Sequence, residues 1–435
     1  MSPDWTQDGA EVSTNLSYSF TVTEAADYVA NFELLTAVTQ TTHFVEGWTW
    51  WSTFIEQYDA TGLNQLETGL GANGQVIKTQ NASLTYLGNG WYGNLEALDN
   101  TEAYRVKSAA AADVTLTGVP VATAEHPITL RPNWTWLGYP SVTPMSVEEA
   151  LAGITPQEED VLKTQNSMAV YLSGTWYGPL GTLMPGMGLM YLSNGSDDMT
   201  LTFPTLGKGG ELRPNLTAEN NHWQPNTAAY ADNMTVIAVV ELDGEELEVP
   251  ELVPEPVEGR EGPTQELGKT YELAVFAHGE CRGSVQLLYV EPIQRHIAFL
   301  TVSGSEAAEL RFGLYDMTTG EEYHNAEETL TYASNAVVGS LDVPLVVRFR
   351  GNTGLCDLDR LVQVFPNPVG KGQTFNVGLA DGEIGEAQVD VINALGVVVE
   401  TRRATSLQAP NVPGVYTLRI TVEGQGTCYR KLIVR

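Results

Sequence analysis

The sequence contains few cysteines. Its 435 residues include only three, Cys281, Cys356 and Cys428, and none of them has the C-x-x-C spacing that is typical of structural zinc sites. A zinc finger and a disulfide-dense scaffold are therefore excluded. One disulfide between two of the three cysteines stays open, and the alternative is three separate thiols.

Positive charge is also scarce. Lys and Arg number 22 against 54 Asp and Glu, which gives a formal net charge of −32. A field of this sign repels polyanions, so we expect no nucleic-acid partner and no attraction to anionic membrane surfaces. No apolar run approaches the roughly 20 residues that cross a bilayer, which predicts a chain without membrane insertion.

Catalytic motifs are missing as well. The six histidines show neither H-E-x-x-H nor H-x-H spacing, and no G-x-S-x-G segment occurs. Cys281 is the cysteine best placed to react, because the charge of Arg282 would favour its thiolate. No His or Asn partner can be assigned to it, which favours a structural cysteine. We therefore expect no enzyme activity and no cofactor.

Acidic side chains are too numerous for their count to indicate a site. The clusters Asp197-Asp198 and Glu158-Glu159-Asp160 lack the alternating D-x-D-x-D-G pattern that places several oxygens around one calcium ion. Solvated acidic turns are the simpler interpretation of both clusters. We expect no metal site, and bound calcium stays an alternative.

Two domain-sized segments of the chain repeat each other. Three motifs recur in the same order, with an offset of 86 residues for the first (48 to 134) and 85 for the others (78 to 163): Gly47-Trp48-Thr49-Trp50 with Asn133-Trp134-Thr135-Trp136, Lys78-Thr79-Gln80-Asn81 with Lys163-Thr164-Gln165-Asn166, and Trp91-Tyr92-Gly93 with Trp176-Tyr177-Gly178. This register predicts two tandem copies of one module, over residues 37–118 and 119–206.

Each copy is expected to be mostly β with one short helix. Aromatic and β-branched runs bounded by Gly, Asn and Pro are typical of short strands. In the first copy, Leu63, Leu66 and Leu70 have the spacing of a helix face. In the second, Ser146 and Glu149 form a capping-box pattern.

The repeated aromatics are the one candidate ligand-binding feature. Indole and phenol rings can stack on sugars or anchor a protein partner, and five rings are our candidates: Trp51, Trp91, Tyr92, Trp176 and Tyr177. Strand alternation puts Trp48 and Trp50 on one face and Trp51 on the other, and we take the Trp51 face as the exposed one. The competing interpretation makes these rings the hydrophobic centre of each module.

The rest of the chain divides into four further segments. Residues 1–36 resemble the C-terminal half of an internalin-type B repeat, a small β-grasp module, through Trp5-Thr6-Gln7-Asp8-Gly9 and the alternating run from Tyr18. Residues 207–222 read as a linker, and many short alternating segments predict an Ig-like β-sandwich over residues 223–350. The Pro/Glu run at residues 249–258 is expected to be an extended loop within it.

Residues 357–435 resemble the type A C-terminal sorting domain of proteins exported by the bacterial type IX secretion system. The motifs that carry this resemblance are Phe365-Pro366-Asn367-Pro368, Gly414-Val415-Tyr416 and the final Lys431-Leu432-Ile433-Val434. The resemblance implies an Ig-like sandwich, recognition by the outer-membrane export machinery, and a protein that is secreted or held at the outer cell surface. It assigns the sorting signal to these residues: Phe365, Pro366, Asn367, Pro368, Gly414, Tyr416, Lys431, Leu432 and Val434.

The family also uses an N-terminal secretory signal, which this sequence lacks, so we expect a portion of a longer protein. The predicted function is a non-enzymatic spacer or adhesion region with a glycan or protein ligand, followed by an export signal. Two alternatives stay open. One is an accessory region of a secreted hydrolase, most plausibly a peptidase, with its catalytic domain upstream; the other is a purely structural stalk.

Overall fold

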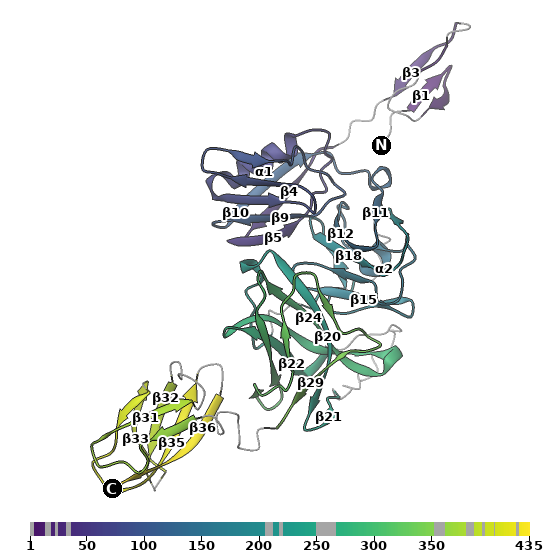
Figure 1. Cartoon of the computed structure of the whole chain (residues 1–435). Helices are drawn as coiled ribbons and strands as arrows, with labels where there is room; N and C mark the ends of the chain where they lie inside the picture. Colours follow the sequence, from purple (N-terminus) through teal and green to yellow (C-terminus); the bar gives the residue numbers. More distant parts are fainter. Residues whose placement is uncertain are drawn as a thin grey trace, which may run out of the picture. The chain divides into compact units, whose positions relative to one another are not determined.

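The computed structural model describes residues 4–13, 19–21, 25–31, 36–204, 212–216, 221–248, 267–351, 362–379, 387–393, 396–403, 405–422 and 426–435. Cys356, the 249–258 run and most of the 207–222 linker lie outside these residues. The chain forms two compact units, Met1–Leu216 with Ala228–Ala231 and Thr217–Thr227 with Asp232–Arg435. Strands dominate both units (Figure 1), so the predicted mostly β, multidomain architecture is confirmed.

The N-terminal residues form a small antiparallel sheet. Its order is β2-β1-β3, and its strands are β1 (Asp4–Gln7), β2 (Ala10–Ser13) and β3 (Tyr28–Asn31). The resemblance of this segment to an internalin-type B repeat stays a prediction.

The two tandem modules contain the same sheet. The strands of the first copy are β4 (Val38–Phe44), β5 (Gly47–Trp51), β6 (Gly74–Lys78), β7 (Ser83–Tyr86), β8 (Trp91–Gly93), β9 (Tyr104–Ser108) and β10 (Ala112–Gly118). Those of the second are β11 (Ile128–Leu130), β12 (Asn133–Gly138), β13 (Met145–Ser146), β14 (Val161–Lys163), β15 (Met168–Leu172), β16 (Thr175–Tyr177), β17 (Thr182–Leu183), β18 (Gly188–Ser193) and β19 (Met199–Leu201). The five-stranded orders β5-β9-β6-β7-β8 and β12-β18-β14-β15-β16 correspond strand by strand. In each copy the Gly/Asn-Trp-Thr-Trp strand therefore lies at a sheet edge.

Each copy has the predicted short helix. In α1 (Thr61–Leu70), Leu63, Leu66 and Leu70 are buried in the module core, as their spacing predicts. In α2 (Val147–Ala150), the Ser146 hydroxyl accepts a hydrogen bond from the backbone N–H of Glu149 at 3.1 Å. This is the N-cap that the capping-box pattern predicts.

Two Ig-like sandwiches complete the chain. Strands of the first are β20 (Asp232–Leu242), β21 (Glu245–Glu246), β22 (Leu267–Ala277), β23 (Glu280–Val290), β24 (Arg295–Gly304), β25 (Glu309–Asp316), β26 (Glu321–Tyr323), β27 (Thr329–Thr331), β28 (Val337–Val338) and β29 (Leu345–Phe349). Those of the second are β30 (Val362–Phe365), β31 (Thr374–Leu379), β32 (Ala387–Ile392), β33 (Val398–Arg403), β34 (Ser406–Gln408), β35 (Gly414–Val422) and β36 (Gly426–Val434). The second packs the sheet β30-β31-β34 on β33-β32-β35-β36, with Phe375, Leu418 and Leu432 in its core.

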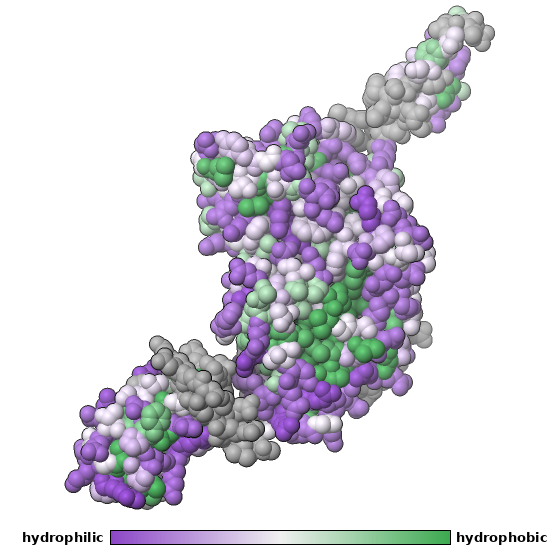
Figure 2. Space-filling view, in the orientation of Figure 1, coloured by the Kyte–Doolittle hydropathy of each residue, from purple (hydrophilic) through white to green (hydrophobic). Residues whose placement is uncertain are grey.

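The surface of the tandem modules is mainly hydrophilic in the view of Figure 2, whereas hydrophobic residues gather over the middle of the first sandwich. Within the described residues, the chain has no helix with the length and apolar character needed to span a membrane.

Candidate functional site

Two glutamines join the tandem modules by reciprocal hydrogen bonds. The Gln165 amide accepts from the backbone N–H of Trp50 at 3.0 Å and donates to the carbonyl of Trp48 at 2.9 Å. Gln80 makes the same two bonds to the other copy, accepting from Trp136 N–H at 2.9 Å and donating to Trp134 O at 3.0 Å. Each glutamine thereby satisfies part of the free backbone edge of the facing strand, as a neighbouring strand would.

The repeated Lys-Thr-Gln-Asn motif is the turn that presents each glutamine. In the first copy the backbone of Thr79 bonds to Ala82 O at 2.8 Å, and in the second Thr164 bonds to Ser167 O at 2.8 Å. The threonine hydroxyl of each turn accepts from backbone N–H groups two and three residues on. Side chains of this kind close a turn locally, which fixes the direction of the glutamine between them.

Arg105 lies at the centre of this contact. Its guanidinium carbon is 4.1 Å from the ring centre of Trp50 and 3.7 Å from that of Trp136, and the two indoles are nearly parallel at 6.5 Å. The position equivalent to Arg105 in the second copy is Met190, and the Arg105 Nη2 lies 3.0 Å from the Met190 sulfur. We call this set the clasp: Gln80, Gln165, Arg105, Met190 and the four tryptophans of β5 and β12 that they contact, Trp48, Trp50, Trp134 and Trp136.

A lysine of each copy also contacts the clasp tryptophans. The Lys78 ammonium lies 5.2 Å from the Trp48 ring centre, and that of Lys163 lies 4.1 Å from Trp134. Lys163 is fully buried, and burial, followed by the nearby charge of Arg105, holds the pKa of Lys163 well below its ordinary value. The sequence repeat revealed these motifs, but not that each copy's motif contacts the other copy.

The predicted exposure of Trp51 is wrong. Its side chain is 1% exposed, packs against Phe44 and Tyr104, and donates its indole N–H to Thr42 at 2.9 Å. The alternation of faces was correct, but the opposite face of the strand is covered by the clasp, where Trp50 is buried and Trp48 half-buried. Trp176 is also buried, at 3%, in the core of the second copy.

The other aromatic candidates are more accessible. Tyr92 is 52% exposed, and Trp91 and Tyr177 are half-buried. Trp91 packs on Tyr86 and over Gly74, where a side chain would collide with its ring. The structure therefore leaves Tyr92 as the most exposed of the five rings, and the group does not form a single surface.

A polar cleft lies beside the clasp at the free edge of β12. Its volume is about 320 Å³, and both copies contribute to its lining: Gln80, Asn81, Asp99, Thr101, Glu102, Pro127, Ile128, Thr129, Arg131, Thr135 and Trp136. We call it the inter-copy cleft. The lining residue Thr101 is joined to the second copy, because Gly138 N–H donates to Thr101 O at 3.0 Å; the equivalent bond of the repeat joins Ser52 N–H to Gly186 O at 2.9 Å.

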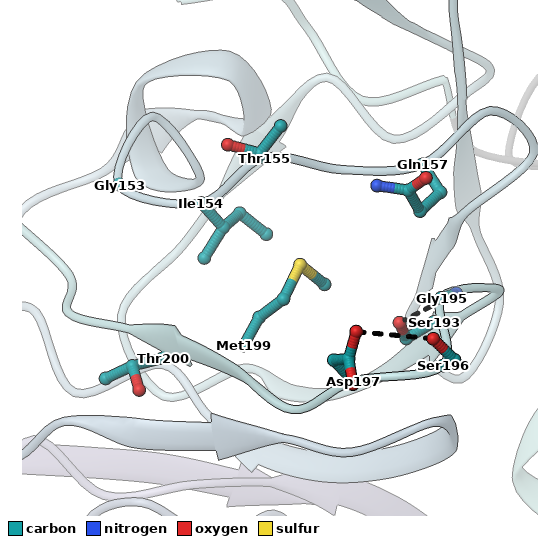
Figure 3. Close-up of a pocket in the computed structure, with 10 residues that line it drawn as sticks. All are labelled: Gly153, Ile154, Thr155, Gln157, Ser193, Gly195, Ser196, Asp197, Met199 and Thr200. Atoms are coloured by element: carbon teal, nitrogen blue, oxygen red, sulfur yellow. Dashed lines mark hydrogen bonds between the residues drawn. The ribbon is translucent and has the colours of Figure 1, made fainter.

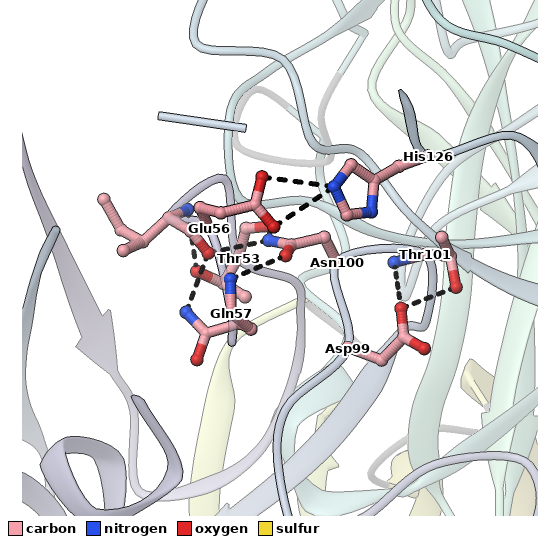
Figure 4. Close-up of polar contacts among 8 residues, drawn as sticks. Thr53, Glu56, Gln57, Asp99, Asn100, Thr101 and His126 are labelled. Carbon is pink, nitrogen blue, oxygen red and sulfur yellow. Dashed lines mark hydrogen bonds and ion pairs between the residues drawn. The ribbon is translucent and has the colours of Figure 1, made fainter. Parts of the chain in front are cut away.

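One wall of the cleft is held by a buried hydrogen-bond network (Figure 4). The Asn100 amide donates to the carbonyls of Thr53 and Ile55 at 3.0 and 2.7 Å and accepts from Gln57 N–H at 3.1 Å. His126, near the start of the second copy, pairs with Glu56 of the first copy at 3.1 Å. The segment joining the copies is thus fixed to the first copy, which restricts how the two can move.

A second hollow of about 370 Å³ lies within the second copy (Figure 3). Ile154 and Met199 line it together with Gln157, Ser196 and Asp197, among others. The neighbouring Asp160 is fully buried and accepts hydrogen bonds from Tyr191, Gln157 and Asn194. Its oxygens therefore serve the fold, and the described part of the chain holds no group of three or more metal-binding side chains.

The environment of Cys281 fits a structural cysteine, the interpretation that the sequence favours. Burial, together with the charges of Glu272 and Glu280, raises its pKa to about 12. The Arg282 guanidinium that was expected to favour the thiolate lies 3.3 Å from Glu280 instead. Cys281 is therefore a poor nucleophile at neutral pH.

The predicted sorting-signal residues fall into two groups. Tyr416, Leu432 and Val434 are buried in the C-terminal sandwich. The other group is exposed and comprises Phe365, Pro366, Asn367, Pro368, Gly414 and Lys431. Asn367 joins the Phe365-Pro366-Asn367-Pro368 segment to β36, the last strand. Its amide donates to Lys431 O at 2.6 Å and accepts from Ile433 N–H at 2.9 Å.

No protein-family model and no curated protein matches this chain. Among solved structures it is similar to SGBP-B of the Bacteroides ovatus mixed-linkage glucan utilization locus, determined with a mixed-linkage heptasaccharide, at 9% identity and a TM-score of 0.14. That match covers 100% of this chain and 60% of the other. A Dscam structure matches at 9% identity and a TM-score of 0.16, over 81% of this chain and 79% of that one. Latent PorU from Porphyromonas gingivalis matches at 10% identity and a TM-score of 0.13, over 92% of this chain and 32% of that one. At TM-scores this low, none of these matches assigns the chain to a family.

Proposed function

We propose that this chain is a non-catalytic region of a secreted bacterial surface protein, in which the tandem modules bind a glycan or protein ligand and the C-terminal sandwich directs type IX export. The observation that carries the binding part is the clasp. It joins the two copies through paired hydrogen bonds and stacked rings, and it leaves a polar cleft with walls from both copies.

Preorganisation is the physical reason to favour binding over a passive stalk. A site whose walls are already fixed loses less conformational freedom when a ligand binds, which leaves more of the contact energy for affinity. The Asn100 network and the His126–Glu56 pair fix the segment beside the cleft. A stalk would not need a polar hollow at this position. The charge of −32 favours a neutral ligand over an anionic one.

The export part of the proposal rests on the C-terminal sandwich. Asn367 holds the exposed Phe365-Pro366-Asn367-Pro368 segment against the last strand, beside the exposed Lys431. Exposed residues that are close together but far apart in sequence can be read by the outer-membrane export machinery as one folded surface. Tyr416, Leu432 and Val434 would then support that surface from inside the sandwich.

Surface display tests the export proposal. The chain would be expressed behind a secretory signal peptide in a bacterium with a type IX system, and its exposure on intact cells measured by antibody binding and by added protease. We expect the full chain on the surface or in the medium, and a chain lacking residues 357–435 in the periplasm. Equal surface exposure of the shortened chain would contradict the proposal.

A further inference from the structure

The two copies share the glutamines and tryptophans of the clasp but not the charged lining of the inter-copy cleft. Identical counterparts exist for Gln80, Thr135 and Trp136, namely Gln165, Thr49 and Trp50. Three charged lining residues have apolar counterparts instead: Asp99, Glu102 and Arg131 correspond to Met184, Met187 and Val45. Comparison of the two copies thus distinguishes the residues that both copies use in the clasp from the charged residues that are present only in the cleft.

The backbone turn beside the cleft does not depend on the two carboxylates, whereas Asp99 Oδ1 also accepts hydrogen bonds from the N–H and the hydroxyl of Thr101 at 2.8 and 2.7 Å. In the first copy the backbone N–H of Glu102 bonds to Asp99 O at 3.3 Å, and in the second Met187 N–H bonds to Met184 O at 3.1 Å. Methionine side chains therefore support the same turn. They also support the same strand-end hydrogen bond to the facing copy.

Ionisation of a carboxyl group in the inter-copy cleft is unfavourable in the free protein. Glu102 is half-buried, and burial, followed by the charge of Asp99, raises its pKa. Both effects disfavour the charged carboxylate in the free protein. A carboxyl of this kind in a cleft, at a position where its counterpart is apolar, is a candidate ligand contact.

The lining has the chemistry of a site for hydroxyl groups. Arg131 donates hydrogen bonds, Asp99 and Glu102 accept them, and Asn81 and Thr101 do both. A sugar hydroxyl both donates and accepts, so it can use neighbouring groups of both kinds. The apolar lining is limited to Pro127, Ile128 and Trp136, too little to hold a hydrophobic side chain. The volume of about 320 Å³ lies at the small end of ligand sites, which run from about 300 to 1,000 Å³.

We propose that the inter-copy cleft is a subsite for a neutral oligosaccharide, with Arg131 donating to its hydroxyl groups and Asp99 and Glu102 accepting from them. This inference rests on the proposed binding function of the tandem modules, and it names the site and the ligand class.

The second copy supplies the residues for the test. In the full chain, Asp99→Met, Glu102→Met and Arg131→Val would be combined, since each new residue already occupies the equivalent position of the other copy. The control is Glu46→Gln, an exposed position outside the cleft that changes the net charge by the same amount. Binding would be measured by calorimetry against neutral hexaoses of β-1,4-glucose, β-1,3-glucose, α-1,4-glucose and mannose, and against a lysine-rich peptide. Thermal unfolding and amide exchange at Trp136 would verify that the clasp is intact.

We expect the chain to bind at least one hexaose, the triple variant to lose at least tenfold in affinity, and Glu46→Gln to stay within twofold. Saccharide binding that the triple variant retains would overturn the cleft as its site while leaving the binding function in place. Binding of the lysine-rich peptide alone, lost in the triple variant, would overturn the ligand class. A chain that binds none of these probes would overturn both this inference and the glycan part of the proposed function.

Discussion

Asp390 is an almost fully buried carboxylate of the C-terminal sandwich. It accepts from Arg419 Nη2 at 2.6 Å and from the Thr401 hydroxyl at 2.6 Å. Burial acts to raise the pKa of Asp390, but the hydrogen bonds from Thr401 and Arg419 and the charge of Arg419 outweigh it and hold the pKa below its ordinary value. The ionised form is therefore part of the stable fold.

This geometry predicts a pH-dependent mutational effect. A carboxyl with a lowered pKa in the fold contributes stability above its unfolded pKa of about 3.9, and the contribution is lost as pH falls through the folded pKa. Asp390→Asn should thus cost about 2 kcal/mol at pH 7, since it weakens hydrogen bonds to a charged group, and much less in strong acid. The loss of stability can be measured by amide hydrogen exchange in β32 and β35 at pH 7 and in strong acid, detected by mass spectrometry.

The control for Asp390 is Glu400→Gln, which weakens an ion pair with Arg402 at the surface; both residues lie in β33, the strand beside β32. Exposed pairs contribute about 0 to 1 kcal/mol, so this change should have little effect at either pH. An effect of Asp390→Asn that persists unchanged in acid would show that packing, and not charge, is what the carboxylate provides.

Residue types alone predicted the cap at Ser146 and favoured a structural Cys281, but they did not show which group Arg282 contacts. Arg282, the neighbour of Cys281, suggested a reactive thiolate. In the fold, Arg282 contacts Glu280, and burial sets the thiol's pKa. A sequence neighbour indicates an electrostatic partner only where the backbone turns the two side chains toward each other, and that is a property of the strand and its pairing.

At the scale of elements, the repeated Trp-Tyr-Gly motif ends a hairpin in each copy. Gly178 follows β16 with a φ of +135°, and a side chain there would meet the backbone oxygen of Met168 at 2.6 Å. Gly93 repeats this in the first copy, with a φ of +155° and a contact to Ser83 O of 1.9 Å. Both glycines are needed for their positive φ and for the close approach of two backbones.

Gly178→Ala should therefore destabilise the second copy by about 2 to 4 kcal/mol, through backbone strain and a collision that the neighbouring strand cannot avoid. Gly174→Ala is the matched control in the same hairpin, because its φ is +90° but no atom lies within 4 Å of the added carbon. Only the backbone strain of a positive φ acts at Gly174, so Gly174→Ala should destabilise the second copy by about 1 kcal/mol. Thermal unfolding of the two variants compares them, and equal losses would show that the close approach is relieved elsewhere.

The clasp gives a second prediction at this scale. Gln165→Ala removes two hydrogen bonds to the edge of β5, at about 0.5 to 1.5 kcal/mol each. The Trp50 amide proton should then exchange about 5- to 150-fold faster, because RT is about 0.6 kcal/mol. Gln65→Ala is the control, since Gln65 accepts from Thr117 N–H within one copy. Slow exchange at Trp50 in the Gln165 variant would mean that the remaining contacts between the copies, such as the ring stacking and the Ser52–Gly186 backbone bond, are enough to protect this edge.

The strand content and the helices followed from local patterns, whereas the clasp did not. Leu63, Leu66 and Leu70 bury one face of a helix wherever that helix lies, so their spacing was sufficient. The edge of β5 has no such local signal. Whether Trp48 and Trp50 face solvent or a neighbour depends on Gln165, more than a hundred residues away. The identity of the Lys-Thr-Gln-Asn motif in both copies was the only indication in the sequence.

At the scale of the whole molecule, the excess of negative charge opposes the compact state. With a net charge of −32, like charges repel across the surface, and salt screens them with a Debye length of about 10 Å at 0.1 M. Raising NaCl from 10 to 300 mM should therefore increase the midpoint of thermal unfolding by a few degrees. Sucrose at matched osmolality is the control for non-ionic effects. A midpoint that falls with salt would indicate that attractive pairs such as Arg295–Glu246 outweigh the repulsion.

Arg105 and Met190 occupy equivalent positions and meet each other at the centre of the clasp. Two first copies from different chains would bring two arginines together there, and repulsion between buried like charges would oppose that contact. Two second copies would meet through methionines and would lack the guanidinium that fills the space between the indoles. A single difference between the copies thus makes a first copy pair with a second one. Self-association through two like copies is therefore disfavoured, and any association through the clasp must join a first copy of one molecule to a second copy of another.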